Sequence, residues 1–226
     1  METEKDPIAL MAARVDHRSE VEDMADPIFS IKIFALNERE LVRLLKNKDR
    51  AAFKTIVETW QNMVYNTALG ILQNEEDAED TAQEVFMKVY EAIDSFKEES
   101  KLSTWIYRIT VTRSMDLIRR KKRKKRFAFI QSLYGKNDGM MIDPPDFFHP
   151  GVSLENKENA AVLFKAIDQL PPNQKVAFVL NKIEGLSYVE IGEVMNLSDS
   201  AVDALLQRAK KKLQGNLLSF YNNSKE

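Results

Sequence analysis

The sequence predicts an all-α protein with two helical domains joined by a flexible linker, the C-terminal one a helix-turn-helix. Glycine and proline are scarce, at seven each in 226 residues, and six of these fourteen lie between residues 127 and 158. Apolar residues recur at helical spacing on both sides of that segment, and no apolar–polar alternation is long enough to predict a strand. With 44% hydrophobic residues, each half can bury a core.

Residues 37–126 are expected to form the first domain, and its helices follow from the apolar spacing. The first helix is short and opens with a capping box in Asn37-Glu38-Arg39-Glu40. The other helices are expected over about residues 49–72, over 75–93, and from Ser103 or Thr104 as N-cap past residue 120. Gly70 is interpreted as the frayed end of the second helix.

Three segments are expected to lie outside the two domains. Residues 127–153 are predicted to be the interdomain linker because their glycines and prolines interrupt helices. Residues 1–36 form an acidic, weakly patterned extension, and residues 219–226 form a tail. One hypothesis is that the carboxylates of the extension cover the basic surface of the free protein. A disordered tail and a misassigned start remain alternatives.

Residues 154–218 are expected to form the second domain, which begins with a helix over about residues 153–169. Pro171-Pro172 suits the start of the next helix, where a missing N–H costs nothing. Gly185 suits the left-handed residue at its end.

The end of this domain carries the signals of a helix-turn-helix. Ser187 and Glu190 form a capping box, and Asn196-Leu197-Ser198 makes a tight turn before a last helix whose outer face is basic. Two short helices joined in this way are typical of a motif that enters the DNA major groove. The alternative is an ordinary helical hairpin with a solvated lysine face.

The net charge is only −2, but the charges are segregated along the chain. Residues 101–126 contain eleven lysines and arginines against the single Asp116. Residues 74–99 contain ten carboxylates against two lysines. Such blocks indicate two kinds of partner, one polyanionic and one basic or mixed.

Composition argues against several functions. Cysteine is absent and the only histidines are His17 and His149, so we expect no disulfide, no metal centre and no cofactor. We also expect no catalytic residues, because an enzyme acting on nucleic acid would need a metal-binding carboxylate cluster or a nucleophile beside a base. No apolar run approaches a bilayer span and the N-terminus lacks a basic start, which predicts a cytoplasmic protein without membrane insertion.

Three blocks carry a family resemblance. They are DAEDTAQEVFMKVYEAIDSF, STWIYRITVTRSMDLIRRKKR and, after the linker, LPPNQKVAFVLNKIEGLSYVEIGEVMNLSDSAVDALLQRAKKKL. In order and spacing they resemble the extracytoplasmic-function (ECF) sigma factors of the bacterial sigma-70 family, over about residues 38–126 and 155–215. The resemblance implies a region 2-like domain at 37–126 and a region 4-like domain at 154–218. It implies a sigma factor that directs RNA polymerase core to specific promoters and assists their opening.

The resemblance also implies three contact surfaces. The third helix would bind the clamp helices of the largest polymerase subunit, with a solvated face as the alternative; its candidates are Asp77, Asp80, Gln83, Glu84, Met87 and Lys88. The loop after it and the fourth helix would hold unpaired −10 bases by stacking and cationic contacts. Those candidates are Lys101, Ser103, Thr104, Trp105, Arg108, Arg113, Arg119 and Arg120. The last helix would read the −35 element through Ser200, Ala201, Asp203, Ala204, Gln207, Arg208 and Lys211.

Some residues leave alternatives open. For Trp105 taken alone, a core role is favoured over base stacking. Asp203 and Leu205 stand where many relatives carry basic residues, and Thr112 where asparagine is frequent. An acidic side chain near the groove accepts from cytosine but repels phosphate, so Asp203 weakens the transfer of a standard −35 sequence.

The family implies one more partner and leaves one rival class of protein. An anti-sigma factor is the implied inhibitory partner. The rival is a stand-alone regulator that binds duplex DNA through the helix-turn-helix and never contacts polymerase. That reading leaves the acidic helix and the aromatic-basic helix beside it without a purpose.

Overall fold

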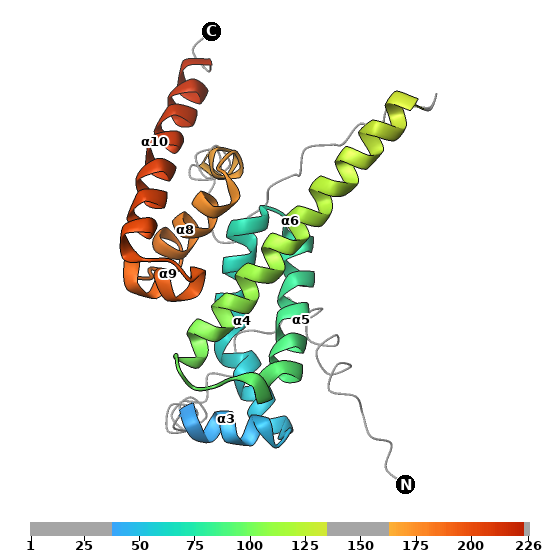
Figure 1. The fold of residues 1–226 in the computed structure, drawn as a ribbon, viewed down its shortest axis with the longest axis vertical. Helices are drawn as coiled ribbons and strands as arrows, with labels where there is room; N and C mark the ends of the chain where they lie inside the picture. The colour runs from blue at the N-terminus through green and yellow to red at the C-terminus, as the bar shows by residue number, and fades with distance from the viewer. Residues whose placement is uncertain (1–37, 135–162, 224–226) are drawn as a thin grey trace, which may run out of the picture.

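The computed structural model describes residues 38–134 and 163–223, and every regular element in these two ranges is helical. The elements are α3 (Glu38–Lys46), α4 (Arg50–Leu72), α5 (Glu75–Ala92), the 3-10 turn η1 (Ile93–Ser95), α6 (Leu102–Tyr134), α8 (Pro172–Lys182), α9 (Tyr188–Met195) and α10 (Asp199–Asn223), as Figure 1 shows. A further helical stretch covers residues 163–168. The all-α prediction is confirmed.

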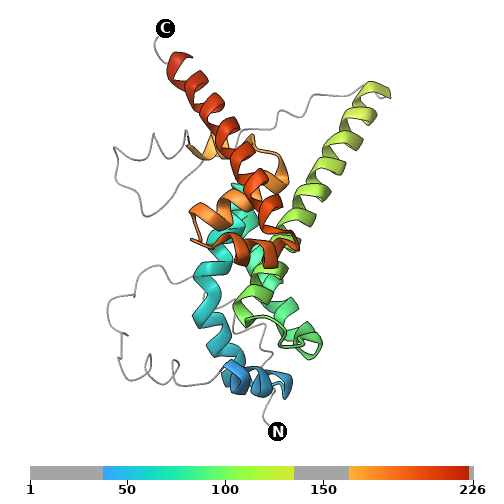
Figure 2. The ribbon, with the colours of Figure 1, turned by 60° about the vertical axis from the view of Figure 1, so that its left-hand side comes forward.

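The helices α3 to α6 form an N-terminal bundle. α4, α5 and α6 pack against one another, and α3 contacts α4 and η1 at the end of the bundle where α6 begins (Figures 1 and 2). Their inward faces form one apolar core, because each helix places an apolar stripe toward the others. Its fully buried large side chains are Val42, Leu45, Ile56, Phe86, Ile93, Leu102 and Ile106.

The starts of the bundle helices are fixed by side-chain caps. The Asp49 carboxylate accepts a hydrogen bond from the Ala52 amide at 2.8 Å, and this begins α4 where the sequence predicts it. At α6 the prediction that Ser103 or Thr104 is the N-cap was wrong. The helix already begins at Leu102, whose amide donates to Glu38 Oε1 at 2.6 Å. A carboxylate from α3 therefore caps α6 from 64 positions away in the sequence.

The C-terminal helices form the predicted helix-turn-helix, with α9 and α10 joined by a tight turn. The Ser187–Glu190 capping box is present, and Asn196 adopts the left-handed conformation at the end of α9. Gly192 is required for the turn, because a Cβ there would lie 2.7 Å from the carbonyl oxygen of Leu197. The absence of a side chain at Gly192 therefore lets the turn fold back closely on α9.

The two sets of helices share a second apolar core. α4 packs against α8, and α6 against α9 (Figures 1 and 2). Ile71 and Tyr107 from the N-terminal bundle are buried together with Val176, Val179 and Leu180 of α8. The C-terminal helices are therefore seated on the bundle rather than separated from it.

The interpretation of Gly70 as a frayed end was wrong. Gly70 is buried within α4, which continues to Leu72. A Cβ at this position would lie 2.8 Å from a methyl group of Val179 on α8 and 3.2 Å from Cδ1 of Ile183, the residue that follows the end of α8. The missing side chain is what lets the two helices approach closely.

Two predicted boundaries also differ from the structure. α6 runs on through residues 127–134, which the sequence analysis assigns to the linker, and α10 runs to Asn223, inside the predicted tail. The predicted N-terminal extension, the rest of the predicted linker and the capping residue Asn37 lie outside the described residues. Within the described ranges, no helix is both long and apolar enough to cross a membrane.

The capping box gives a stability prediction. Ser187→Ala removes the acceptor for the Glu190 amide and should lower the free energy of unfolding by about 1 kcal/mol. Ser187→Thr keeps a hydroxyl and is the matched control, expected to lose only a small part of that amount. Urea unfolding followed by circular dichroism measures both variants. An alanine variant as stable as the threonine variant would show that the cap contributes nothing.

Candidate nucleic-acid and polymerase interfaces

The predicted polymerase-binding residues lie on one helix, α5, at spacings that place most of them on one face. Asp80, Gln83 and Met87 are exposed, and Met87 is a large apolar side chain with 39% of its surface accessible. Lys88 is half-buried and pairs with Glu91 at 3.6 Å. An exposed methionine among polar groups is suited to an adaptable protein contact.

The acidic and basic blocks of the sequence partly face each other. Asp77 turns toward α6 and pairs with Lys121. Glu84 lies 3.9 Å from both Arg113 and Arg120. These ion pairs are half-exposed, so solvent screening makes each of them weak. The predicted polymerase-binding residues of α5 therefore border the predicted −10-binding residues of α6. The ion pairs between them neutralise part of the acidic block and part of the basic block.

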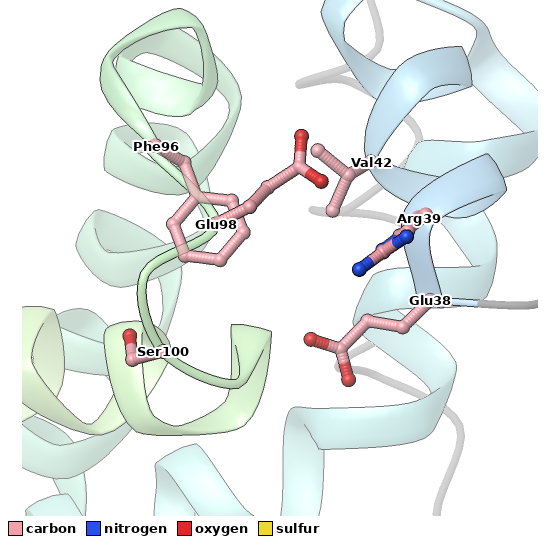
Figure 3. Close-up of a pocket in the computed structure, with 6 residues that line it drawn as sticks. All are labelled: Glu38, Arg39, Val42, Phe96, Glu98 and Ser100. Atoms are coloured by element: carbon pink, nitrogen blue, oxygen red, sulfur yellow. The ribbon is translucent and has the colours of Figure 1, made fainter.

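The loop before α6 is held by α3. Figure 3 shows Phe96, Glu98 and Ser100 of the loop facing residues of α3 across a pocket of about 180 Å³. Lys46 pairs with Glu98 at 3.4 Å, and Glu98 itself has a left-handed backbone with φ of 58°. Together with the Glu38 cap, these contacts fix the loop and the first turn of α6 as one unit.

The residues predicted to hold the −10 strand are distributed along α6 and differ in their exposure. Lys101 and Arg108 are exposed, as are Arg119 and Arg120 farther along. Thr104 is 5% exposed, so its hydroxyl is turned into the bundle. Ser103 is half-buried in the same turn.

Trp105 packs beside the loop rather than standing free. Its ring lies against Phe96, with centroids 5.2 Å apart and planes inclined by 39°. It borders the apolar core of the bundle, an environment that favours a core role over base stacking.

Three polar contacts join the start of α6 to the C-terminal helices. The Tyr107 hydroxyl donates to Glu184 Oε2 at 2.9 Å, and Arg108 Nε donates to the Glu193 carbonyl at 2.9 Å. Lys101 pairs with Glu190 at 3.6 Å. Sequence reasoning missed Glu184 and Glu193, because residues 77 and 85 positions apart leave no local signal of contact.

Burial shapes the electrostatics of this contact. Desolvation raises the pKa of the Glu184 carboxyl, and the hydrogen bond from Tyr107 acts in the opposite direction. Desolvation is the main cause that raises the pKa of the Tyr107 hydroxyl, and the neighbouring negative charge of Glu184 raises it further. Tyr107 is therefore a neutral donor in this pair. The hydrogen bonds from the Ser187 backbone and hydroxyl lower the pKa of Glu190, and the Lys101 charge adds to this effect.

The predicted −35 residues lie along α10. Ser200, Gln207, Arg208 and Lys211 are exposed, whereas Ala201, Asp203 and Ala204 are half-buried. The opposite face of the helix is anchored by buried Val202, Leu206, Ala209 and Leu213. The exposed donors thus project from a helix whose inner face is fixed in the apolar core, which is the arrangement required for reading base edges.

Family comparisons match both halves of the chain. The description Sigma-70 region 2 matches residues 56–124, and the description Sigma-70, region 4 matches residues 161–213. These are the domains through which sigma-70 factors bind RNA polymerase core and promoter DNA. Both predicted domain types are confirmed.

Curated relatives make the assignment narrower. The ECF RNA polymerase sigma factor SigW of Bacillus subtilis is 30% identical over 182 residues, covering 79% of this chain and 96% of SigW. The ECF RNA polymerase sigma-E factor of Escherichia coli K12 is 27% identical over 176 residues, covering 78% of this chain and 92% of that protein. The chain belongs to the ECF sigma factors, and it directs RNA polymerase core to promoters in transcription initiation.

Two solved structures share the fold. CnrH, determined in complex with the cytosolic domain of CnrY, gives a TM-score of 0.58 at 22% identity and covers 80% of this chain and 97% of CnrH. The sigma factor RpoE from Bartonella quintana, determined with the anti-sigma factor NepR, gives 0.56 at 22% identity, covering 73% of this chain and 96% of that protein.

The Glu38 cap gives a prediction about promoter opening. Glu38→Ala leaves the Leu102 amide without its acceptor and should cost about 1 kcal/mol, which corresponds to roughly fivefold weaker open-complex formation. Glu38→Gln keeps an oxygen acceptor and should stay near the wild type. Open complexes are measured by permanganate footprinting at fixed holoenzyme concentration. Equal footprints for the alanine and glutamine variants would contradict a positioning role.

Proposed function

We propose that polymerase binding, −10 binding and −35 recognition are each carried out by one helix face of this sigma factor. The exposed face of α5 binds the clamp helices of the largest polymerase subunit. The basic side of α6 holds the opened −10 strand, and the exposed side of α10 reads the −35 element. The observation that carries this proposal is that each set of exposed candidates projects from a single helix whose opposite face is buried.

The α6 assignment is supported by its continuous exposed cations. Every residue from Arg119 to Arg126 is exposed, and α6 is one unbroken helix through this stretch. Because such a row of like charges gathers phosphates and releases counterions, binding should fall steeply as salt rises. Trp105 and Thr104 are given a supporting role here: they shape the loop from within rather than touch the strand.

The −35 assignment separates base reading from phosphate binding. Gln207 and Arg208 carry the donors able to contact base edges, and Lys211 one turn on serves phosphates. Asp203 is half-buried near these residues, and we propose that it favours a cytosine amino group at its position.

Regulation and location follow from the family. We place the protein in the cytoplasm with RNA polymerase and propose that it catalyses no reaction of its own. RpoE from Bartonella quintana was determined with the anti-sigma factor NepR, and we propose that an anti-sigma factor likewise binds this chain. The hypothesis that residues 1–36 cover the basic surface stays a prediction.

The polymerase face is tested by charge reversal. Asp80→Arg on the exposed face of α5 should weaken core binding by about tenfold or more, because like charges at an interface cost several kcal/mol. Glu99→Arg, an exposed acidic residue in the loop after α5, is the matched control and should bind core normally. Competition against labelled wild-type protein for purified core measures both affinities. Equal affinity of the two variants would contradict this use of α5.

The promoter assignment is tested by transcription with core polymerase over a pool of genomic promoters. Arg208→Ala should relax −35 preference and cost about 1–3 kcal/mol on the preferred sequence. Lys211→Ala should weaken all promoters alike and reduce the salt slope by about one. Lys182→Ala, an exposed lysine on α8, is the control. An unchanged −35 preference in the Arg208 variant would remove that residue from the base-reading set.

A further inference from the structure

We propose that the basic end of α6, residues 121–126, is a second DNA site that takes double-stranded DNA rather than the opened strand. Its ligand is the promoter duplex that continues from the opened segment, held through the phosphates on both sides of the major groove. The inference rests on the function proposed for α6, because it assigns the next stretch of the same promoter. It concerns the helix beyond the strand-holding candidates Arg119 and Arg120.

The end of α6 stands clear of the rest of the bundle. Its last turns project beyond the ends of α4 and α5 in both views (Figures 1 and 2). Ser114 is the last buried residue among the described side chains of α6, and every residue from 119 to 128 is exposed. Packing in the bundle therefore does not explain why the helix continues.

The charges of this segment are not balanced within the described chain. Six consecutive residues, 121–126, are all lysine or arginine. Lys121 pairs with Asp77, but none of the five cations that follow has a carboxylate partner in the part of the chain that the structure describes. Like charges one turn apart on a helix repel each other, so the segment is suited to an anionic ligand that offsets this repulsion.

The geometry of a helix determines which anion fits this segment. With about 3.6 residues per turn, six consecutive cations point to every side of the helix. A single strand can meet only one side. The major groove of B-form DNA is about 12 Å wide and admits an α-helix between its two phosphate backbones. A helix in that groove places cations on opposite sides beside opposite backbones, whereas the deep and narrow major groove of an RNA duplex excludes it.

The position of the basic segment separates it from the strand-holding loop. Lys122 lies 21 positions after Lys101, which is about 32 Å along a helix. At about 3.4 Å per base step, this is the length of about nine steps of DNA. The chain after α6 leads to the module proposed to read the −35 element. We therefore assign the basic segment to the duplex between the −10 and −35 elements.

An anionic lipid surface is the main alternative ligand. Phe127 follows the basic segment with 66% of its surface exposed, and cations beside an exposed aromatic ring suit such a surface. A helix lying on lipid, however, needs an apolar face opposite its cations, and residues 121–126 contain no apolar position. Duplex DNA therefore explains the segment better.

Neutralising three cations in the holoenzyme tests the site. The test variant combines Lys122→Gln, Arg123→Gln and Lys125→Gln, because glutamine is a good helix former. The control variant removes the same charge from exposed lysines elsewhere, by Lys54→Gln, Lys165→Gln and Lys182→Gln. Binding of each holoenzyme to a duplex promoter from the genomic pool is measured between about 50 and 200 mM salt.

The test variant should lose much of its salt dependence. If each cation contacts a phosphate, the slope of log affinity against log salt falls by about 2.7, or about 0.9 per cation. Across this range of salt, the wild type should therefore lose about fortyfold more affinity than the test variant. The control variant should keep the wild-type slope. Equal slopes for the test and control variants would overturn the inference.

Neutral phosphate analogues locate the contact. Methylphosphonate linkages placed in the duplex between the two elements should weaken the control variant about tenfold and the test variant less than twofold, because coupled changes are not additive. The isolated −10 strand should be bound nearly as well by the test variant as by the control. Equal losses on the substituted duplex, or a loss on the isolated strand as large as on the duplex, would overturn the inference.

The remaining outcomes separate this site from the proposed function. If the wild-type holoenzyme starts no RNA on the promoter pool, the proposed function fails. If it starts RNA but the test variant binds every DNA as the control does, only the duplex site is overturned. Flotation of the free chain with phosphatidylglycerol vesicles covers the lipid alternative. Vesicle binding lost in the test variant alone, with DNA binding kept, would also overturn the duplex site.

Discussion

The rest of the structure depends on the burial of one side of α6. Leu102 and Ile106 are fully buried in the bundle core, and this fixes the rotation of the helix about its axis. Its remaining sides then face defined neighbours: α5 with its carboxylates, α9 with Glu193, and solvent along the basic run. Because one helix makes all of these contacts, the DNA binding proposed for α6, the polymerase binding proposed for α5 and the packing of the C-terminal helices on α6 are not independent properties of this sigma factor.

The C-terminal helices were predicted well from capping and turn residues that act over short distances in the sequence. The box formed by Ser187 and Glu190, the proline at the start of α8 and the left-handed Gly185 act within a few residues, so their signals are readable in the sequence. The cap on Leu102 was not predictable in this way, since Glu38 reaches it only after the bundle has folded. Gly70 was misread for the same reason: the partner that requires it lies on another module.

The end of α6 shows a different limit of sequence reading. A change of composition at residue 127 suggested a linker, but residues 127–134 contain no glycine or proline, so nothing interrupts the helix before Gly135. The family resemblance supplied candidate residues on α5 and α10, and several of them are exposed in the structure. The three contacts between α6 and the C-terminal helices were not predictable, because they join residues from separate domains.

The missing side chain of Gly192 has a mechanical consequence. Because the Leu197 carbonyl lies where a Cβ of Gly192 would be, the turn packs directly against α9 and couples α9 to α10. α9 accepts a hydrogen bond from Arg108 of α6, and α10 presents the exposed Arg208, the residue proposed to contact the −35 element. A displacement of α9 from Arg108 would therefore turn α10 as well, so the direction in which Arg208 faces depends on how α9 is seated on α6.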